Sequence, residues 1–250
     1  SSDVCSSDLG FPALDAILAR GGLPREASAA FRGDLSSGKT TLALRCVAEA
    51  QARGSIAAWA DHGRTFDPVE AVARGVALDR LVVLRPEDVA EGFAMAGALL
   101  AGRAVDLLVL DLPARLPART DGSIRRLAAH VRRIGARLIV LEPAAVPDPV
   151  HGALAEAASL RLDLERRGWI RLGRDVVGQR TRVVVERDRH GAPGRTVDLE
   201  LHYVTDGERS VATHRFASER AAAARPVAAA RPPDRKSTRL NSSHVALSRM

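Results

Sequence analysis

Hydrophobic positions along the first 143 residues change repeatedly between two spacings. Five short apolar runs have the length of buried strands: 27–33, 55–61, 80–86, 104–112 and 136–142. Four longer segments carry apolar residues at helical spacing: 39–53, 67–75, 87–103 and 122–134. This alternation predicts an α/β fold with a central, mostly parallel sheet flanked by helices.

The pattern changes after Pro143. The segments 158–172, 181–189 and 196–204 alternate apolar and polar residues with a period of two. Such alternation is typical of antiparallel strands that bury one face. The sequence therefore predicts an antiparallel extension of the parallel sheet. From about Ser218 the chain is rich in Ala, Arg and Pro and has no core-forming pattern.

The two ends of the chain resemble translated sequencing adapter. Ser1–Leu9 and Asp234–His244 are what a common adapter encodes when its two strands are read. Because one DNA string accounts for both ends, residues 1–9 and 234–250 are interpreted as artificial and set aside. The alternative is a pair of ordinary polar tails. The remaining chain is predicted to form a core, 10–205, and a tail, 206–233.

Composition narrows the class of protein. Apolar residues make up 46% of the chain but aromatic residues only 3%, so the core must consist mostly of Ala, Leu and Val. No apolar run approaches the ~18 residues that a membrane span needs, and no secretory signal is visible, which predicts a cytoplasmic protein. Cys46 is the one cysteine outside the excluded ends, so we expect a buried hydrophobe rather than a disulfide or metal ligand. The net charge of +7 is compatible with nucleic acid but not diagnostic of it.

The stretch GDLSSGKT, followed by another threonine, matches the phosphate-binding pattern G-x-x-x-x-G-K-[ST] between a predicted strand and helix. Its backbone amides and the helix N-terminus can surround phosphate groups, its lysine can neutralise them and its Thr40 hydroxyl can ligate Mg²⁺. We therefore predict a site for a nucleoside triphosphate and Mg²⁺ formed by Gly33, Asp34, Leu35, Ser36, Ser37, Gly38, Lys39, Thr40 and Thr41.

Two further residues support this site. Lys39 is the only lysine outside the excluded ends, and it stands where a compact ammonium suits the space between phosphates better than a guanidinium. Asp111 closes the apolar run 104–112, where a magnesium ligand is expected. The alternative for Asp111 is a strand-end aspartate that caps a turn.

Four segments resemble the bacterial RecA recombinases and occur in that family's order: GLPREASAAFRGDLSSGKTTLAL, RTFDPVEAVARGVALDRLVVLRP, AVDLLVLDLPARL and ASLRLDLERRG…DVVGQRTRVVVERDR. The resemblance covers roughly residues 10–205. It implies a RecA-like P-loop NTPase core that binds ATP and Mg²⁺, acts in DNA recombination, DNA repair and the SOS response, and polymerises on single-stranded DNA.

The chain departs from the family where ATP is hydrolysed. In the family, the segment that matches WADHGRTFDP carries a glutamate that activates the attacking water, and that position here is Gly63. Asp61 or His62 could stand in for it, although a loop histidine can equally be a solvated bystander. The resemblance assigns Asp67 to the adenine, whereas the aromatic residue that stacks on the base is replaced by Glu70.

The DNA-binding side also departs from the family. The segments after 104–112 and 136–142, which match the family's two DNA loops, are short and interrupted by prolines, and a sensor Asn-Gln pair is replaced by Glu142-Pro143. Arg187 and Arg189 keep positive charge where the family has lysines that reach a neighbouring subunit's ATP. Their alternative role is that of a solvated strand edge.

These features leave three functions open. The first is a divergent RecA-like repair protein that binds ATP and single-stranded DNA, self-associates and hydrolyses ATP weakly. The second is a non-hydrolysing scaffold similar to the shortened RecA paralogues of the ImuA type, with a translesion polymerase as partner. The third, a P-loop kinase, lacks a recognisable substrate lid.

Overall fold

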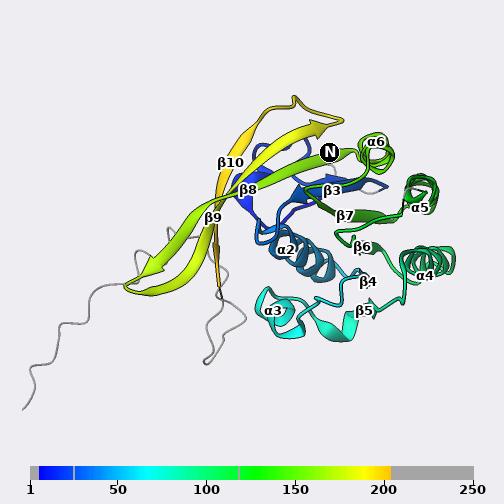
Figure 1. The fold of residues 1–250 in the computed structure, drawn as a ribbon, viewed down its shortest axis with the longest axis horizontal. Coiled ribbons are helices and arrows are strands. Elements are labelled where there is room, and N and C mark those ends of the chain that lie inside the picture. Colours follow the sequence, from blue (N-terminus) through cyan, green and yellow to red (C-terminus); the bar gives the residue numbers. More distant parts are fainter. Residues whose placement is uncertain (1–5, 25, 118, 204–250) are drawn as a thin grey trace, which may run out of the picture. The chain divides into compact units, whose positions relative to one another are not determined.

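The computed structural model of the chain describes residues 6–24, 26–117 and 119–203. Within these residues one eight-stranded sheet has the order β10-β9-β8-β3-β7-β6-β4-β5 (Figure 1). Its parallel part consists of β3 (Ser28–Gly33), β4 (Ala57–Asp61), β5 (Leu81–Leu84), β6 (Leu107–Asp111), β7 (Arg137–Pro143) and β8 (Leu160–Leu172). The antiparallel part adds β9 (Asp175–Asp188) and β10 (Thr196–His202) to the edge at β8. The predicted α/β class and the antiparallel extension are both confirmed.

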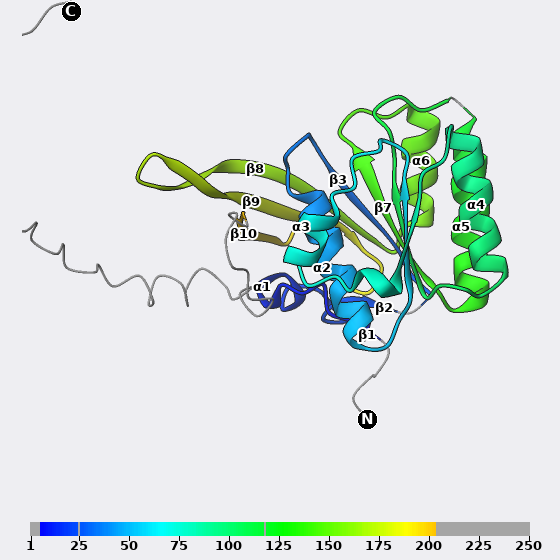
Figure 2. The same cartoon turned by 90° about the horizontal axis from the view of Figure 1, so that it is seen from below.

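Helices cover both faces of the sheet (Figure 2). One face carries α1 (Pro12–Asp15), α2 (Lys39–Ala52) and α3 (Pro68–Ala73), and the other carries α4 (Val89–Ala101), α5 (Thr120–Ile134) and α6 (Asp148–Ala157). A short 3-10 turn, η1 (Leu78–Arg80), precedes β5, and β1 (Ser6–Ser7) pairs with β2 (Leu23–Pro24) outside the main sheet. None of the helices among the described residues is long and apolar enough to span a bilayer.

The continuous apolar runs arise because the central strands are buried on both faces. In β4, Ala57 and Trp59 pack on the α2 side, while Ala58 and Ala60 pack on the α4 side. Trp59 is fully buried, and its ring lies 5.4 Å from that of Phe66. With few aromatic residues, small alanines let the helices approach the sheet closely around this one large side chain.

The structure differs from the sequence prediction at two places. Helix α6 lies within a segment that we expected to be a proline-broken loop. Pro149 stands in its first turn, where a backbone N–H would have no partner within the helix, so the N–H that proline lacks is not missed and the helix is not interrupted. Strand β9 begins at Asp175, six residues before the predicted strand, because 175–180 pairs with the end of β8 in a long hairpin.

The end of the set-aside segment 1–9 is part of this fold, because Ser6 and Ser7 form β1. Leu9 is 1% exposed, and its carbonyl oxygen lies 3.6 Å from the Cys46 Sγ. Cys46 is buried as predicted, and burial raises the pKa of its thiol well above the ordinary value. The predicted tail 206–233 and the set-aside end 234–250 lie outside the described residues.

Candidate functional site

The phosphate-binding loop connects the end of β3 to the start of α2. Gly38 caps the helix with φ 97°, a conformation that favours glycine. A Cβ at this position would also collide with the Leu201 side chain and come within 3.1 Å of Gln179 Nε2. Both the turn and the contact with β9 and β10 therefore require the second glycine of the motif.

Lys39 lies across this loop. Its Nζ donates a hydrogen bond to the carbonyl oxygen of Gly33 at 2.8 Å, which links the two ends of the loop. Burial lowers the pKa of Lys39, while the carboxylates of Asp111 and Asp34 act in the opposite direction. A partly desolvated ammonium held between loop and strand is well placed to attract the oxygens of a polyphosphate.

Asp111 is the last residue of β6, a central strand between β7 and β4. It lines the same cavity as Lys39 and Thr40. Burial raises the pKa of Asp111 to about 6, the ammonium of Lys39 lowers it, and the carboxylate of Asp61 raises it. A carboxylate that is costly to ionise gains most from a cation beside it. The Thr40 hydroxyl and the Asp111 carboxylate are oxygen donors of the kind that Mg²⁺ prefers, so this pair fits the metal.

A cavity of about 610 Å³ brings the predicted residues together. Nine consecutive loop residues, 33–41, line it together with Gly63, Thr65, Asp111, Leu112, Pro113, Ala114, Pro143, Gln179 and Tyr203. The Ser37 Oγ is buried and, within the described part of the chain, has no hydrogen-bond partner. Such an unpaired hydroxyl in a phosphate-binding loop can hydrogen bond to a ligand oxygen.

Gln179 and Tyr203 are cavity residues that the sequence analysis missed. They come from β9 and from the position directly after β10, more than 130 residues beyond the loop in sequence. Tyr203 is the only tyrosine in the chain, which is the one signal that could have drawn attention to it. Its ring gives the cavity the aromatic surface that Glu70 does not provide.

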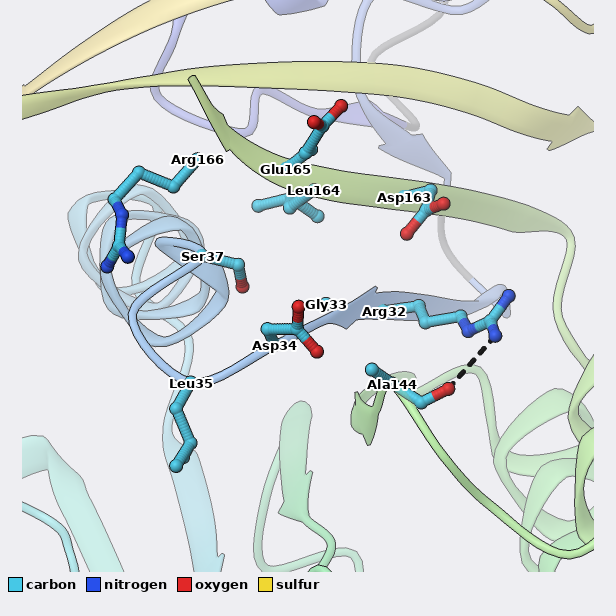
Figure 3. A pocket seen from close by; sticks show the side chains of 10 residues that line it. All are labelled: Arg32, Gly33, Asp34, Leu35, Ser37, Ala144, Asp163, Leu164, Glu165 and Arg166. Carbon is cyan, nitrogen blue, oxygen red and sulfur yellow. Dashed lines mark hydrogen bonds between the residues drawn. The ribbon is translucent and has the colours of Figure 1, made fainter. Parts of the chain in front are cut away.

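A second cavity of about 460 Å³ lies on the β8 side of the loop (Figure 3). Charged side chains of both signs surround it, among them Arg32, Asp163 and Arg166. Arg32 donates a hydrogen bond to the carbonyl oxygen of Ala144 at 2.9 Å, which ties β3 to the segment after β7. Leu35, at the tip of the loop, is 92% exposed and points away from the other side chains in Figure 3.

The cavity lacks a carboxylate at the position where the family has its water-activating glutamate. Gly63 lines the cavity, and a Cβ there would meet nothing closer than Thr65 Cγ2 at 3.4 Å. Asp61 is fully buried and accepts hydrogen bonds from the backbone N–H groups of Thr65 and Phe66 at 2.9 and 3.1 Å. Its carboxylate thus holds the turn that carries Gly63.

His62 is also engaged elsewhere. Its Nδ1 lies 3.0 Å from the carbonyl oxygen of Asp111, and its ring lies close to Gly92 and Phe93 of α4. Neither it nor Asp61 is among the residues that line the cavity. The two alternative bases considered from sequence therefore have structural roles in this arrangement.

Asp67 caps helix α3. Its Oδ1 accepts hydrogen bonds from the backbone N–H groups of Val69 and Glu70 at 2.8 and 3.3 Å, and the residue does not line the cavity. Asp67→Ala is expected to lower the free energy of unfolding by about 1 kcal/mol through loss of this cap. Chemical denaturation measures the effect. Asp67→Asn keeps the cap and removes the carboxylate. A loss of ATP affinity in this variant would therefore indicate that the carboxylate contacts adenine.

Glu142 is held in a buried ion pair at the end of β7. Both of its carboxylate oxygens lie 3.0 Å from Nη2 of Arg161, and His151 Nδ1 lies 3.3 Å from Oε1. Burial raises the pKa of Glu142, and the guanidinium of Arg161 opposes this shift. The side chain that replaces the family's sensor residue is thus tied to β8 and α6, while Pro143 lines the cavity.

Arg187 and Arg189 lie beside the start of β8, outside the cavity that the loop lines. The loop follows Gly33, which pairs with Leu164, whereas Arg187 pairs with Arg161, three residues earlier in β8, and the Arg189 N–H donates to the carbonyl oxygen of Ser159. The Arg187 guanidinium donates to the carbonyl oxygen of Ala155, and neither arginine lines the cavity. Within one chain the structure does not bring them to the predicted nucleotide site.

Comparison of the sequence with known proteins identifies relatives of this chain. The sequence profile of the RecA N-terminal domain matches residues 1–139. Protein RecA of Methylococcus capsulatus is 34% identical over 219 residues, covering 76% of this chain and 63% of that protein. Protein RecA of Rhodopseudomonas palustris is 32% identical over 231 residues, covering 81% of this chain and 66% of that protein.

These relatives are longer than the matched part, since the chain spans less than two thirds of the length of either one. Among solved structures, a KaiC-like protein from Pyrococcus horikoshii matches with a TM-score of 0.60 at 14% identity, covering 80% of this chain and 99% of that one. At that identity the likeness supports the fold alone.

Proposed function

Because the chain belongs to the RecA family, we propose that it is an ATP-binding protein of DNA recombination and repair that acts in the SOS response. The observation that carries this proposal is a single cavity in which the phosphate-binding loop meets Asp111 and Tyr203. In this proposal the cavity binds ATP with Mg²⁺, and the protein binds single-stranded DNA and self-associates in the cytoplasm, where both ligands are found.

Each end of the cavity has a distinct role in this proposal. The loop amides, Lys39 and the free Ser37 hydroxyl bind the phosphates, and Thr40 with Asp111 holds Mg²⁺. When bound, the metal neutralises charge that develops on the phosphate oxygens. Tyr203 offers an aromatic surface against which the base can pack.

Slow hydrolysis follows from the residue at position 63. The turn that carries Gly63 is fixed by Asp61, so a water molecule near the terminal phosphate has no general base from this segment. A positioned base contributes about 10²–10⁴-fold to rate. We therefore propose that ATP serves more as a bound switch than as a consumed substrate.

A neighbouring copy is needed to complete the family's arrangement. Arg187 and Arg189 lie beside the start of β8 and do not line the cavity of their own chain, so in this proposal they contribute to the nucleotide site of another chain. Their guanidinium groups would then face the phosphates across an interface between copies. Self-association is thus part of the proposal.

The alternative is an ImuA-like accessory protein that binds ATP without hydrolysing it and supports a translesion polymerase. The buried pair of Glu142 with Arg161 favours it, because this position is locked to β8 where the family has a polar sensor. The proline beside it, Pro143, cannot donate a backbone hydrogen bond.

ATP turnover by the full chain, with and without single-stranded DNA, separates the two functions. The RecA-like repair protein is expected to show slow turnover that DNA increases. Tight ATP binding with no turnover, with or without DNA, would instead support the accessory protein. A chain that binds no ATP contradicts both.

A further inference from the structure

A chain of three hydrogen bonds joins the antiparallel strands to the phosphate-binding loop. Tyr203 Oη donates to Gln179 Oε1 at 2.7 Å, Gln179 Nε2 donates to Thr181 Oγ1 at 2.8 Å, and Thr181 Oγ1 donates to the carbonyl oxygen of Ser37 at 3.0 Å. All three donors thus point the same way, from the cavity wall to the loop.

Burial makes this series of hydrogen bonds costly to break. Thr181 is 0% exposed and Gln179 is 2% exposed, so a donor or acceptor that loses its partner here cannot bond to bulk water. Gly38 has no side chain, and this absence allows both residues to approach the loop. The motif glycine and the strand β9 are therefore fitted to each other.

The last of these hydrogen bonds is accepted by the peptide unit that joins Ser37 to Gly38. A carbonyl that accepts a hydrogen bond polarises its peptide, so the N–H at the other side of the same unit becomes a stronger donor. That N–H belongs to Gly38, at the N-terminus of α2, where amides bind anions. Hydrogen bonds that begin at Tyr203 can thus strengthen an amide at the proposed phosphate site.

We propose that Tyr203, Gln179 and Thr181 form a relay that positions the Ser37–Gly38 peptide for phosphate and couples occupancy of the cavity to the β8–β9 hairpin. The three are positioning residues, and the relay rests on the proposed binding of ATP. Gln179 and Thr181 belong to β9 of this hairpin. Trp169 of β8 pairs with Gln179, and its ring lies 6.3 Å from that of Tyr203.

Trp169 provides a reporter for the second half of this proposal. It is 44% exposed and lies under the guanidinium of Arg166 at 4.2 Å, whereas the chain's other tryptophan, Trp59, is fully buried. Acrylamide in solution therefore quenches Trp169 in preference to Trp59. We expect ATP to change this quenching in the unmodified chain but not in Tyr203→Phe, which keeps the ring and loses the hydroxyl.

Thr181→Val removes the last donor of the relay while keeping its shape. ATP affinity is expected to fall about 10-fold, since the loop carbonyl loses a buried partner and the Gly38 amide loses its polarisation. Affinity for adenosine, which has no phosphate, should stay unchanged. Thr181→Ser restores the hydroxyl and should restore ATP affinity. Thr196→Val, at an exposed position on β10, is the matched control and should bind both ligands normally.

The outcomes separate the relay from the proposed function. Equal loss of ATP and adenosine affinity in Thr181→Val would indicate a general packing defect and overturn the positioning role. Unaltered ATP affinity in this variant would overturn it while leaving the proposed function intact. If the unmodified chain binds no ATP, the proposed function itself is wrong. Identical quenching of Trp169 with and without bound ATP would overturn the coupling to the hairpin.

Discussion

Lys39→Met is expected to weaken ATP binding at least ~100-fold, because each charge-assisted hydrogen bond to phosphate is worth about 1.5–3 kcal/mol. Methionine keeps the unbranched stem and removes the ammonium. The ammonium is partly desolvated in the cavity, so bulk water stabilises its charge less than that of an exposed lysine. Isothermal titration of both proteins with ATP and Mg²⁺ measures the effect.

Arg132→Met is the matched control for this variant. It also replaces a positive charge with methionine, but Arg132 is exposed on α5 and does not line the cavity, so its loss should leave ATP affinity unchanged. The hydrogen bond from Lys39 to Gly33 also links the ends of the loop, so the stability of both variants is compared by thermal unfolding. A folded Lys39→Met protein that binds ATP as tightly as the parent would contradict the site.

Gly63→Glu is expected to raise ATP turnover about 100-fold, near the lower end of what a positioned general base contributes. The backbone at Gly63 does not have the positive φ that favours glycine, and the nearest atom to a new Cβ would be 3.4 Å away. A Cβ at this cavity-lining position therefore meets its neighbours only at ordinary van der Waals distance. Steady-state release of phosphate at saturating ATP measures the gain.

Gly63→Gln has the same size and no basic carboxylate, so it should leave turnover at the parent value. An equal gain in both variants would mean that the side chain acts by packing rather than as a base. If Gly63→Glu binds ATP but gains nothing, the remaining machinery is not competent for hydrolysis. That result would favour the ImuA-like accessory protein over the RecA-like repair protein.

Features that depend on local sequence could be predicted well. The spacing of the glycines, Lys39 and Thr40 fixes the loop, because each residue acts through the backbone on either side of it. The doubly buried strands follow from their continuous apolar runs, and Asp111 follows from its place at the end of one. These elements account for the core of the fold and for the phosphate end of the cavity.

Features that depend on distant contacts could not be predicted. Gln179 and Tyr203 reach the cavity only because β9 and β10 lie beside the loop, which no local pattern reveals. Six residues of β9, 175–180, include a glycine and two charged residues, and they form a strand because β8 continues far enough to pair with them. The capping role of Asp67 differs from its family assignment, and it depends on how α3 begins in the folded chain, which the motif alone does not reveal.

The central claim is that the loop between β3 and α2 binds ATP together with Mg²⁺. The most direct test is an equilibrium titration of the unmodified chain with ATP in the presence of Mg²⁺, repeated in EDTA and with AMP. The account predicts saturable binding at a single site, weaker binding without the metal, and the weakest binding for AMP, which lacks the β- and γ-phosphates. Absence of saturable binding up to millimolar ATP, or equal affinity for ATP and AMP, would contradict it.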